Sequence, residues 1–167
     1  MHESAAPGGS PAARVRTVVG FDFGLKRIGI AVGDTLTASA APRPAAHVRA
    51  GRPDWQVIDR EVRAAQPSCL VLGIPYNADG SPGSLTAAAR RFGTLLQSRF
   101  GLGVEHVDER WSSLEASAVL ALHRARGVRR RRVRRDEVDS TAAAVILERW
   151  LGQQTYKLAD KASNSRA

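Results

Sequence analysis

Two apolar stretches near the start of the chain have the pattern of a pair of β-strands joined by a tight turn. Residues 18–23 and 28–32 are mostly apolar, and the segment "GLKR" between them contains a glycine and ends in two cations. This pattern predicts a β-hairpin. Asp22 interrupts the first stretch. A carboxylate on a buried strand must be hydrogen-bonded, paired, neutralised or bound to metal. Asp22 is therefore a candidate functional residue, although an aspartate that caps the turn would give the same pattern.

The next part of the chain predicts one more strand, a helix and a buried strand. Residues 37–47 contain prolines, which restrict a strand there to the edge of a sheet. Residues 53–66 predict a helix that ends before Pro67, with one apolar face formed by Trp55, Ile58, Val62 and Ala65. The short apolar run at 69–75 is typical of a strand that is covered on both faces.

The second half of the chain continues this alternation of helices and strands. A polar loop at 76–84 precedes a helix over 84–100, whose inward positions are predicted to be Leu85, Ala88, Phe92, Leu95 and Leu96. Residues 104–110 alternate like a strand, and a capping box at 112–115 predicts a helix to about residue 126. A last, alanine-rich helix is expected over 136–151. We therefore predict an α/β fold, with a mixed β-sheet of about five strands and helices on both faces.

Length and composition predict one folded domain between two tails. The chain has 167 residues, of which 43% are hydrophobic, and this is enough for a single core. Residues 1–14 and 152–167 have no apolar periodicity and are expected to be disordered, which leaves a domain at 15–151. No apolar run is long enough to span a membrane or to form a secretory signal. The single cysteine, Cys69, excludes an internal disulfide framework. Together these features predict a cytoplasmic protein.

The charge of the chain predicts a nucleic-acid partner. Its 25 Lys and Arg against 16 Asp and Glu give a formal net charge of +9, and the segment "RARGVRRRRVRR" at 124–135 holds most of the excess. Such blocks attract phosphate backbones by Coulomb attraction and by counterion release. A solvated basic loop without a dedicated partner is the alternative. Aromatic residues make up only 5% of the chain, which argues against a base-stacking platform. The candidate binding residues in this block are Arg129, Arg130, Arg131 and Arg132.

Acidic residues on three separate elements suggest a metal site. Asp22 lies on the first strand, Asp108 and Glu109 close the strand at 104–110, and Asp139 lies near the start of the last helix. Apolar residues follow Asp139 at +3, +4 and +7, so its position is on the helix face that is turned toward the sheet. Mg²⁺ and Mn²⁺ prefer such oxygen ligands, and a pair of ions about 3.5–4 Å apart can catalyse phosphodiester hydrolysis. Independent structural acids remain the alternative.

Four segments carry a resemblance to a known family. In order and separation, "FDFGLKRIGIAVGD", "VLGIPYNADGSPG", "VDERWSSLEA" and "VDSTAAAVILERWL" resemble the motifs of the YqgF/RuvX family, over about residues 17–151. The resemblance implies an RNase H-like fold and a metal-dependent nuclease activity. Members of the family are associated with maturation of the 5′ end of precursor 16S ribosomal RNA, and some with Holliday-junction resolution.

The resemblance also implies which residues form the site. Asp22, Glu109 and Asp139 would be the catalytic acids and would hold Mg²⁺ or Mn²⁺, as two ions. Glu109 is preferred to Asp108, which points to the opposite strand face and could hold the following turn. The segment "DERWSS" departs from the family, which usually has a leucine and threonines in place of its tryptophan and serines. The side chains expected near the phosphates are Lys26, Arg27 and Arg110.

Several functions and partners remain open from the sequence. The substrate would be precursor rRNA, within or outside a ribosomal precursor particle, or branched DNA. A Holliday junction resolvase would use the same acids but would need paired active sites, so the chain is expected to be a monomer or a homodimer. A kinase-like phosphate-binding fold would need a second lobe. A non-catalytic RNA-binding assembly factor would use the arginine block and would tolerate the loss of all three acids.

Overall fold

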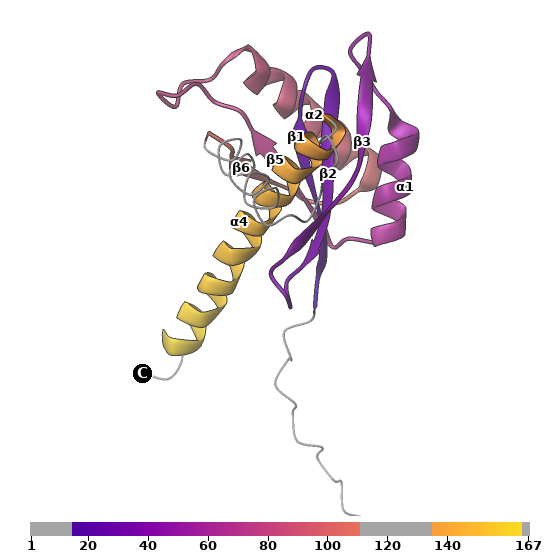
Figure 1. Cartoon of the computed structure of the whole chain (residues 1–167). Coiled ribbons are helices and arrows are strands. Elements are labelled where there is room, and N and C mark those ends of the chain that lie inside the picture. The colour runs from indigo at the N-terminus through magenta and orange to yellow at the C-terminus, as the bar shows by residue number, and fades with distance from the viewer. Residues whose placement is uncertain (1–14, 111–134, 165–167) are drawn as a thin grey trace, which may run out of the picture.

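The fold is built on one mixed β-sheet (Figure 1). The computed structural model describes residues 15–110 and 135–164, and the side chains of 15–110 and 140–155. Six strands in this part of the chain have the order β4-β3-β2-β1-β5-β6. β1 to β4 are antiparallel neighbours, whereas β5 is parallel to β1 and β6 is parallel to β5. The strands are β1 (Thr17–Phe23), β2 (Arg27–Asp34), β3 (Ala40–Arg49), β4 (Arg52–Pro53), β5 (Cys69–Ile74) and β6 (Val104–Asp108).

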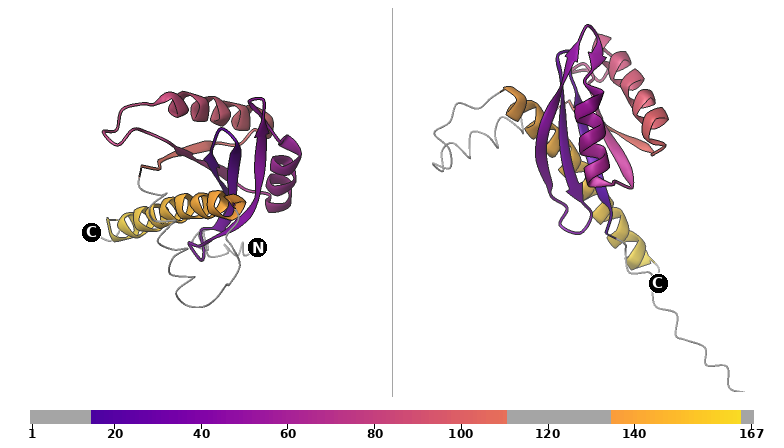
Figure 2. Two further views of the ribbon diagram at one scale, coloured as in Figure 1. Left: turned by 45° about the horizontal axis from the view of Figure 1, so that its top comes forward. Right: turned by 90° about the vertical axis from the view of Figure 1, so that its right-hand side faces the viewer.

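Helices cover both faces of this sheet (Figure 2), which confirms the predicted architecture. The helices α1 (Trp55–Ala65) and α2 (Ser84–Phe100) pack on one face, over the core that contains Phe21 and Leu72. The helix α4 (Arg135–Asn164) crosses the other face, where Ile146 and Leu147 are fully buried. None of the helices in the described ranges is long and apolar enough to cross a membrane.

The sheet has one strand more than the sequence predicts. The predicted hairpin is confirmed as β1 and β2, and the predicted strand with prolines is confirmed as β3, which lies next to the short edge strand β4. The additional strand, β4, consists of two residues that pair with Val48 and Arg49 at the end of β3. A two-residue strand carries no periodicity, so the sequence pattern could not reveal it.

The inward face of α2 differs from the predicted one. Leu95 is 51% exposed, whereas Thr86 is buried at the start of the helix. The Thr86 hydroxyl donates a hydrogen bond to the Pro75 carbonyl, and it accepts one from the Gly83 N–H at 2.8 Å. These bonds tie the helix to the end of β5 and set its rotation. The buried positions are therefore Thr86, Ala89, Phe92, Gly93 and Leu96.

The last helix is longer than the sequence predicts. It begins at Arg135, close to the expected start, but it continues to Asn164 and includes most of the segment that was expected to be a tail. Apart from Gly152, the residues after Leu151 are compatible with a helix, and none is a proline. The helix can therefore extend beyond the sheet, as Figure 1 shows. The helix predicted to follow the capping box lies outside the described residues.

Candidate active site

Asp22 lies in the middle of the sheet, on the face that α4 covers. Side chains alternate along β1, and Val19 and Phe21 pack in the core beneath α1 and α2. Val18 packs against α4, and a β-carbon on Gly20 would lie 2.9 Å from the Leu147 Cβ. Asp22 continues this second set, so its half-buried carboxylate is on the α4 side.

Glu109 reaches toward Asp22 across the strand that separates them. It directly follows β6, and its N–H donates a hydrogen bond to the Ile74 carbonyl at 3.2 Å. Between the two acids lies Gly73 of β5, which pairs with Asp22. A β-carbon on Gly73 would be 2.7 Å from the Glu109 Oε2 and 2.6 Å from the Ile146 Cδ1. The carboxyl group of Glu109 therefore occupies space that any other residue at position 73 would fill.

The two acids interact strongly. Burial raises the pKa of Glu109 from 4.5 to about 9, with further contributions from the charge of Asp22, from a hydrogen bond to Asp22 and from the charge of Asp108. Two carboxylates this close cannot both ionise cheaply unless a cation is present. Their oxygen atoms are ligands that Mg²⁺ and Mn²⁺ prefer, so the pair fits a divalent cation. Among the described side chains no group of three His, Cys, Asp or Glu gathers, and the side chain of Asp139 lies outside that set.

Asp108 points away from this pair, although it is the neighbour of Glu109. Its carboxylate accepts hydrogen bonds from the Arg110 N–H at 3.1 Å and from the Arg110 Nε at 2.8 Å. The side-chain bond from Arg110 is the main cause that lowers the pKa of Asp108. Asp108 thus holds the turn that follows β6. Consecutive residues at the end of β6 point to opposite faces of the sheet. The pKa of Asp108 is therefore lowered beside Arg110, whereas the pKa of Glu109 is raised by burial beside Asp22.

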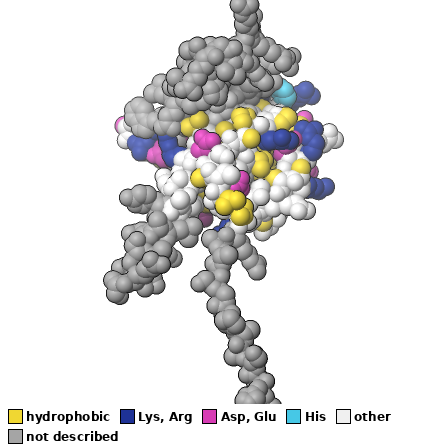
Figure 3. All heavy atoms as spheres, turned by 60° about the horizontal axis from the view of Figure 1, so that its bottom comes forward, with side chains coloured by type: hydrophobic (Ala, Val, Ile, Leu, Met, Phe, Trp, Pro, Cys, Tyr) yellow, Lys and Arg dark blue, Asp and Glu magenta, His cyan; other side chains and the backbone are white. Residues whose placement is uncertain are grey.

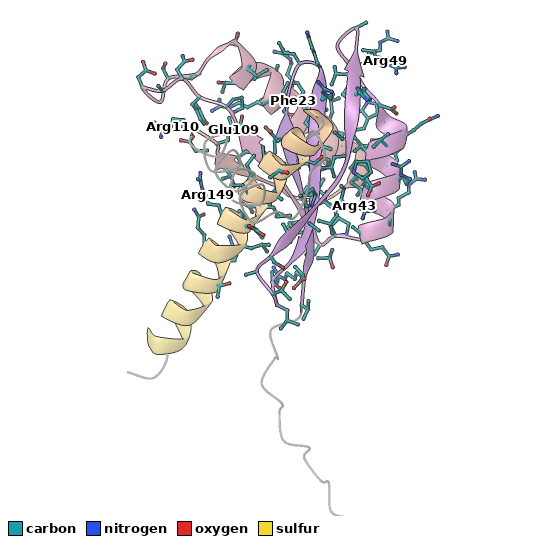
Figure 4. All side chains as sticks on the ribbon, in the orientation of Figure 1. Phe23, Arg43, Arg49, Glu109, Arg110 and Arg149 are labelled. Carbon is teal, nitrogen blue, oxygen red and sulfur yellow. The ribbon has the colours of Figure 1, made fainter. Side chains whose placement is uncertain are left out.

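Arg110 lies over the loop that follows β5. A β-carbon on Gly80, whose φ is +85°, would be 2.8 Å from the Arg110 Nη1. The loop is closed by a hydrogen bond of 2.9 Å from the Asn77 N–H to the Ser81 carbonyl. Its glycine therefore provides both the turn and the room for the guanidinium. Arg110 follows Glu109 in the chain, and Figure 4 shows the two labelled side by side.

For the other predicted site residues, the structure gives the place in the backbone, except for those that lie outside the described residues. Asp139 is helical in α4 and precedes the fully buried Ala143 by one turn. Lys26 and Arg27 lie at the tip and base of the β1–β2 turn, where the Lys26 carbonyl accepts a hydrogen bond from the Val48 N–H at 2.8 Å. Arg129, Arg130, Arg131 and Arg132 lie outside the described residues.

Sequence reasoning missed Gly73 and Arg149. A glycine within an apolar strand is a signal for close approach of another group, so Gly73 could have been found. Arg149 carries no such signal. It lies on α4, and its Nη1 donates a hydrogen bond of 3.4 Å to the Asp108 carbonyl. Figure 4 shows it on the same side of the molecule as Arg110. A hollow of about 330 Å³ is lined by His106, Val107, Asp108, Arg110, Arg149 and Gln153.

The described surface is of mixed sign on the face seen in Figure 3. Lys and Arg side chains gather at the sides of this face, and Asp and Glu side chains lie among the other residues. The strongest concentration of positive charge in the sequence is the segment at 124–135, most of which lies outside the described residues.

Replacement of Gly73 by alanine tests the close approach of Glu109. Because the added methyl group would lie within 3 Å of the ends of both the Glu109 and the Ile146 side chains, both must shift. We expect Gly73→Ala to lower the free energy of unfolding by about 1–3 kcal/mol, as measured by denaturant titration. Gly103→Ala is the matched control, since a β-carbon there meets no atom within 4 Å. Equal stabilities of the two variants would contradict the close contact.

Comparison with known proteins identifies relatives along most of the chain. A family model described as "RuvX: Holliday junction resolvase" matches residues 16–153. A protein of Klebsiella pneumoniae (strain 342), named "Putative pre-16S rRNA nuclease", is 43% identical over 137 residues, which are 82% of this chain and 96% of that protein. A protein of Nitrosococcus oceani with the same name is 44% identical over 142 residues, which are 85% of this chain and 90% of that protein.

A solved structure shares the fold at much lower identity. RuvC of T. thermophilus, in complex with a Holliday junction substrate, matches with a TM-score of 0.52 and 12% identity. The match covers 84% of this chain and 96% of the RuvC chain. At this identity the likeness supports the fold alone, and it agrees with the RNase H-like architecture that the sequence resemblance implies.

Proposed function

The chain belongs to the RuvX family and is a nuclease that hydrolyses phosphodiester bonds, and from this premise we propose that its substrate is precursor 16S ribosomal RNA. The names of its relatives support this substrate. We further propose that Asp22, Glu109 and Asp139 hold the divalent cations of the reaction. The main observation in support of this site is that the carboxyl groups of Asp22 and Glu109 interact directly above Gly73.

The residues of the site are suited to a hydrolytic reaction. Bound Mg²⁺ or Mn²⁺ would supply Lewis-acid stabilisation of the charge that develops on the phosphate and would lower the pKa of water. Asp22 and Glu109 would give up their shared proton and present their oxygens to the cations. Arg110, Lys26 and Arg27 would hold the phosphate backbone rather than read bases. Water would add to phosphorus and give up one proton, the bond to the leaving oxygen would break, and that oxygen would take up one proton, so that each cut consumes one water molecule.

A covalent route through the cysteine is disfavoured. Burial is the main cause that raises the pKa of the Cys69 thiol, so little reactive thiolate forms at neutral pH. Cys69 also lies at the first position of β5, whereas Gly73 is the residue of that strand beside Asp22. Direct attack by water is therefore the proposed mechanism.

A Holliday junction resolvase is the second candidate, because the matching family model carries that description. Resolution of a junction requires two coordinated cuts, and this chain would have to supply them as a homodimer. Processing of precursor rRNA requires only one site and would take place in the cytoplasm, on free RNA or on a ribosomal precursor particle. We favour the RNA because the two relatives described above are named for it.

Cleavage of two labelled substrates side by side tests the proposal. The purified protein is incubated with a precursor 16S rRNA fragment that carries its 5′ extension, and with a four-way DNA junction, each with and without Mn²⁺. We expect metal-dependent cutting of the RNA, no cutting by Asp22→Asn, and an intact junction. Cutting of the junction alone would assign the resolvase function. Tight binding of the RNA without cleavage would assign an assembly factor.

A further inference from the structure

The edge of the sheet has an irregularity at the level of Asp22. Along β2 and β3, Ile28 pairs with Ala46, whereas Ile30 pairs with Arg43, so the register shifts between them. β3 therefore has an extra residue opposite Gly29, which is the β2 partner of Asp22. This is a β-bulge. Bulges leave backbone groups outside the regular ladder and are frequent next to active sites.

The start of α4 is attached to β3 directly beside this bulge. Ser140 is 2% exposed, and its hydroxyl donates a hydrogen bond of 2.6 Å to the Arg43 carbonyl. A serine inside a helix usually bonds to its own helix or to water. Thr155 of α4 does so, because its hydroxyl donates to the Leu151 carbonyl at 3.1 Å. Ser140 instead links the helix to the sheet, one residue after Asp139.

Arg43 is itself held from the opposite face of the sheet. Arg43 is labelled in Figure 4. Its Nε donates to the Glu61 Oε2 at 2.8 Å, and Glu61 of α1 is only 3% exposed. The Arg60 Nε donates to the other oxygen of Glu61 at 3.2 Å. A buried carboxylate without its partners is costly, so this ion pair resists displacement of Arg43. Glu61 and Ser140 thus fix Arg43, the residue just before the bulge, through its side chain and its backbone respectively.

We propose that Ser140 is a positioning residue, which fastens the first turns of α4 to Arg43 beside the bulge and thereby sets the place of Asp139 relative to Asp22. The inference rests on the proposed function, because it takes Asp139 as a ligand of the divalent cation. The role of Ser140 is not chemical. It acts through Asp139, as the outer partners of metal ligands do in other sites.

Metal binding and amide exchange together test this role. In the full-length protein, Ser140→Ala is expected to raise the Mn²⁺ dissociation constant about 10- to 100-fold in calorimetry. Amide hydrogen exchange in the first turns of α4 is expected to accelerate, while kcat for RNA cleavage falls and KM stays within about 2-fold. Ser140→Thr keeps the hydroxyl and should recover most of the Mn²⁺ affinity. Thr155→Ala, which removes a hydroxyl bonded within α4, should match the wild type in all three measurements.

Glu61→Gln tests the same role from the other side of the sheet, in case Ser140→Ala does not fold. Glu61→Gln removes the charge that holds Arg43 without a change in α4, and should weaken Mn²⁺ binding about 3- to 10-fold. If a folded variant, Ser140→Ala or Glu61→Gln, bound Mn²⁺ with wild-type affinity, the positioning role would be overturned. Faster amide exchange without loss of Mn²⁺ affinity would overturn it too, because Ser140 would then only stabilise the helix. A wild-type protein that binds no Mn²⁺ would overturn the proposed function as well.

Discussion

Asp22→Asn, Glu109→Gln and Asp139→Asn are each expected to slow phosphodiester cleavage by at least ~10³-fold while the fold is retained. An amide has nearly the shape of the carboxylate but lacks its charge, so each variant would lose attraction for divalent cations. Because Asp22 and Glu109 contact one another, removal of one charge also relieves repulsion. The melting temperatures of Asp22→Asn and Glu109→Gln without metal should therefore equal or exceed that of the wild type.

The matched control for this prediction is Asp108→Asn. Asp108 is the neighbour of Glu109 but bonds to Arg110 on the opposite strand face. Its replacement should loosen Arg110 and cost less than about 10-fold in single-turnover cleavage at saturating Mg²⁺. A larger loss for Asp108→Asn than for Glu109→Gln would move the site by one residue. Near-wild-type turnover of Asp22→Asn would refute the metal site.

Periodicity within single segments predicted much of the fold. The turn "GLKR" predicted the hairpin that carries Asp22, and the 3-4-3 spacing from Trp55 predicted α1, in which Ile58 and Val62 are buried. The alternation of side chains along a strand also distinguishes Glu109 from Asp108, because consecutive strand residues point to opposite faces. These features depend only on local geometry, which a short stretch of sequence determines.

The features that the sequence could not predict depend on contacts between distant segments. The position of β5 between β1 and β6 brings Gly73 between Asp22 and Glu109, and no local pattern encodes that order. The bulge of β3 was likewise hidden, since its prolines predicted only an edge strand. The rotation of α2 follows from the bond of Thr86 to Pro75, at the end of another element. In each case the geometry depends on pairing or bonding between separate elements, which no single stretch of sequence displays.

The stability of the metal-free protein is expected to fall as the pH rises from about 4.5 to about 9. The pKa of Glu109 is 4.5 when exposed and about 9 in the fold, so between these values the folded state holds a proton that the unfolded state has lost. The free energy of unfolding then decreases with pH, by at most ~1.4 kcal/mol per unit for one proton. Because Glu109 is only partly shielded from water, we expect a total loss of about 2–4 kcal/mol.

Denaturant titrations at several pH values, in the presence of a chelator, measure this loss. Glu109→Gln is the control, because an amide has no proton to lose, and its stability should change much less over the same range. Mn²⁺ should reverse the trend in the wild type, since cation binding requires the deprotonated pair and is favoured as the pH rises. A metal-free wild-type protein whose stability does not decrease between pH 5 and 8 would show that Asp22 and Glu109 do not share a proton. The two acids would then have to be separate structural groups rather than the core of a cation site.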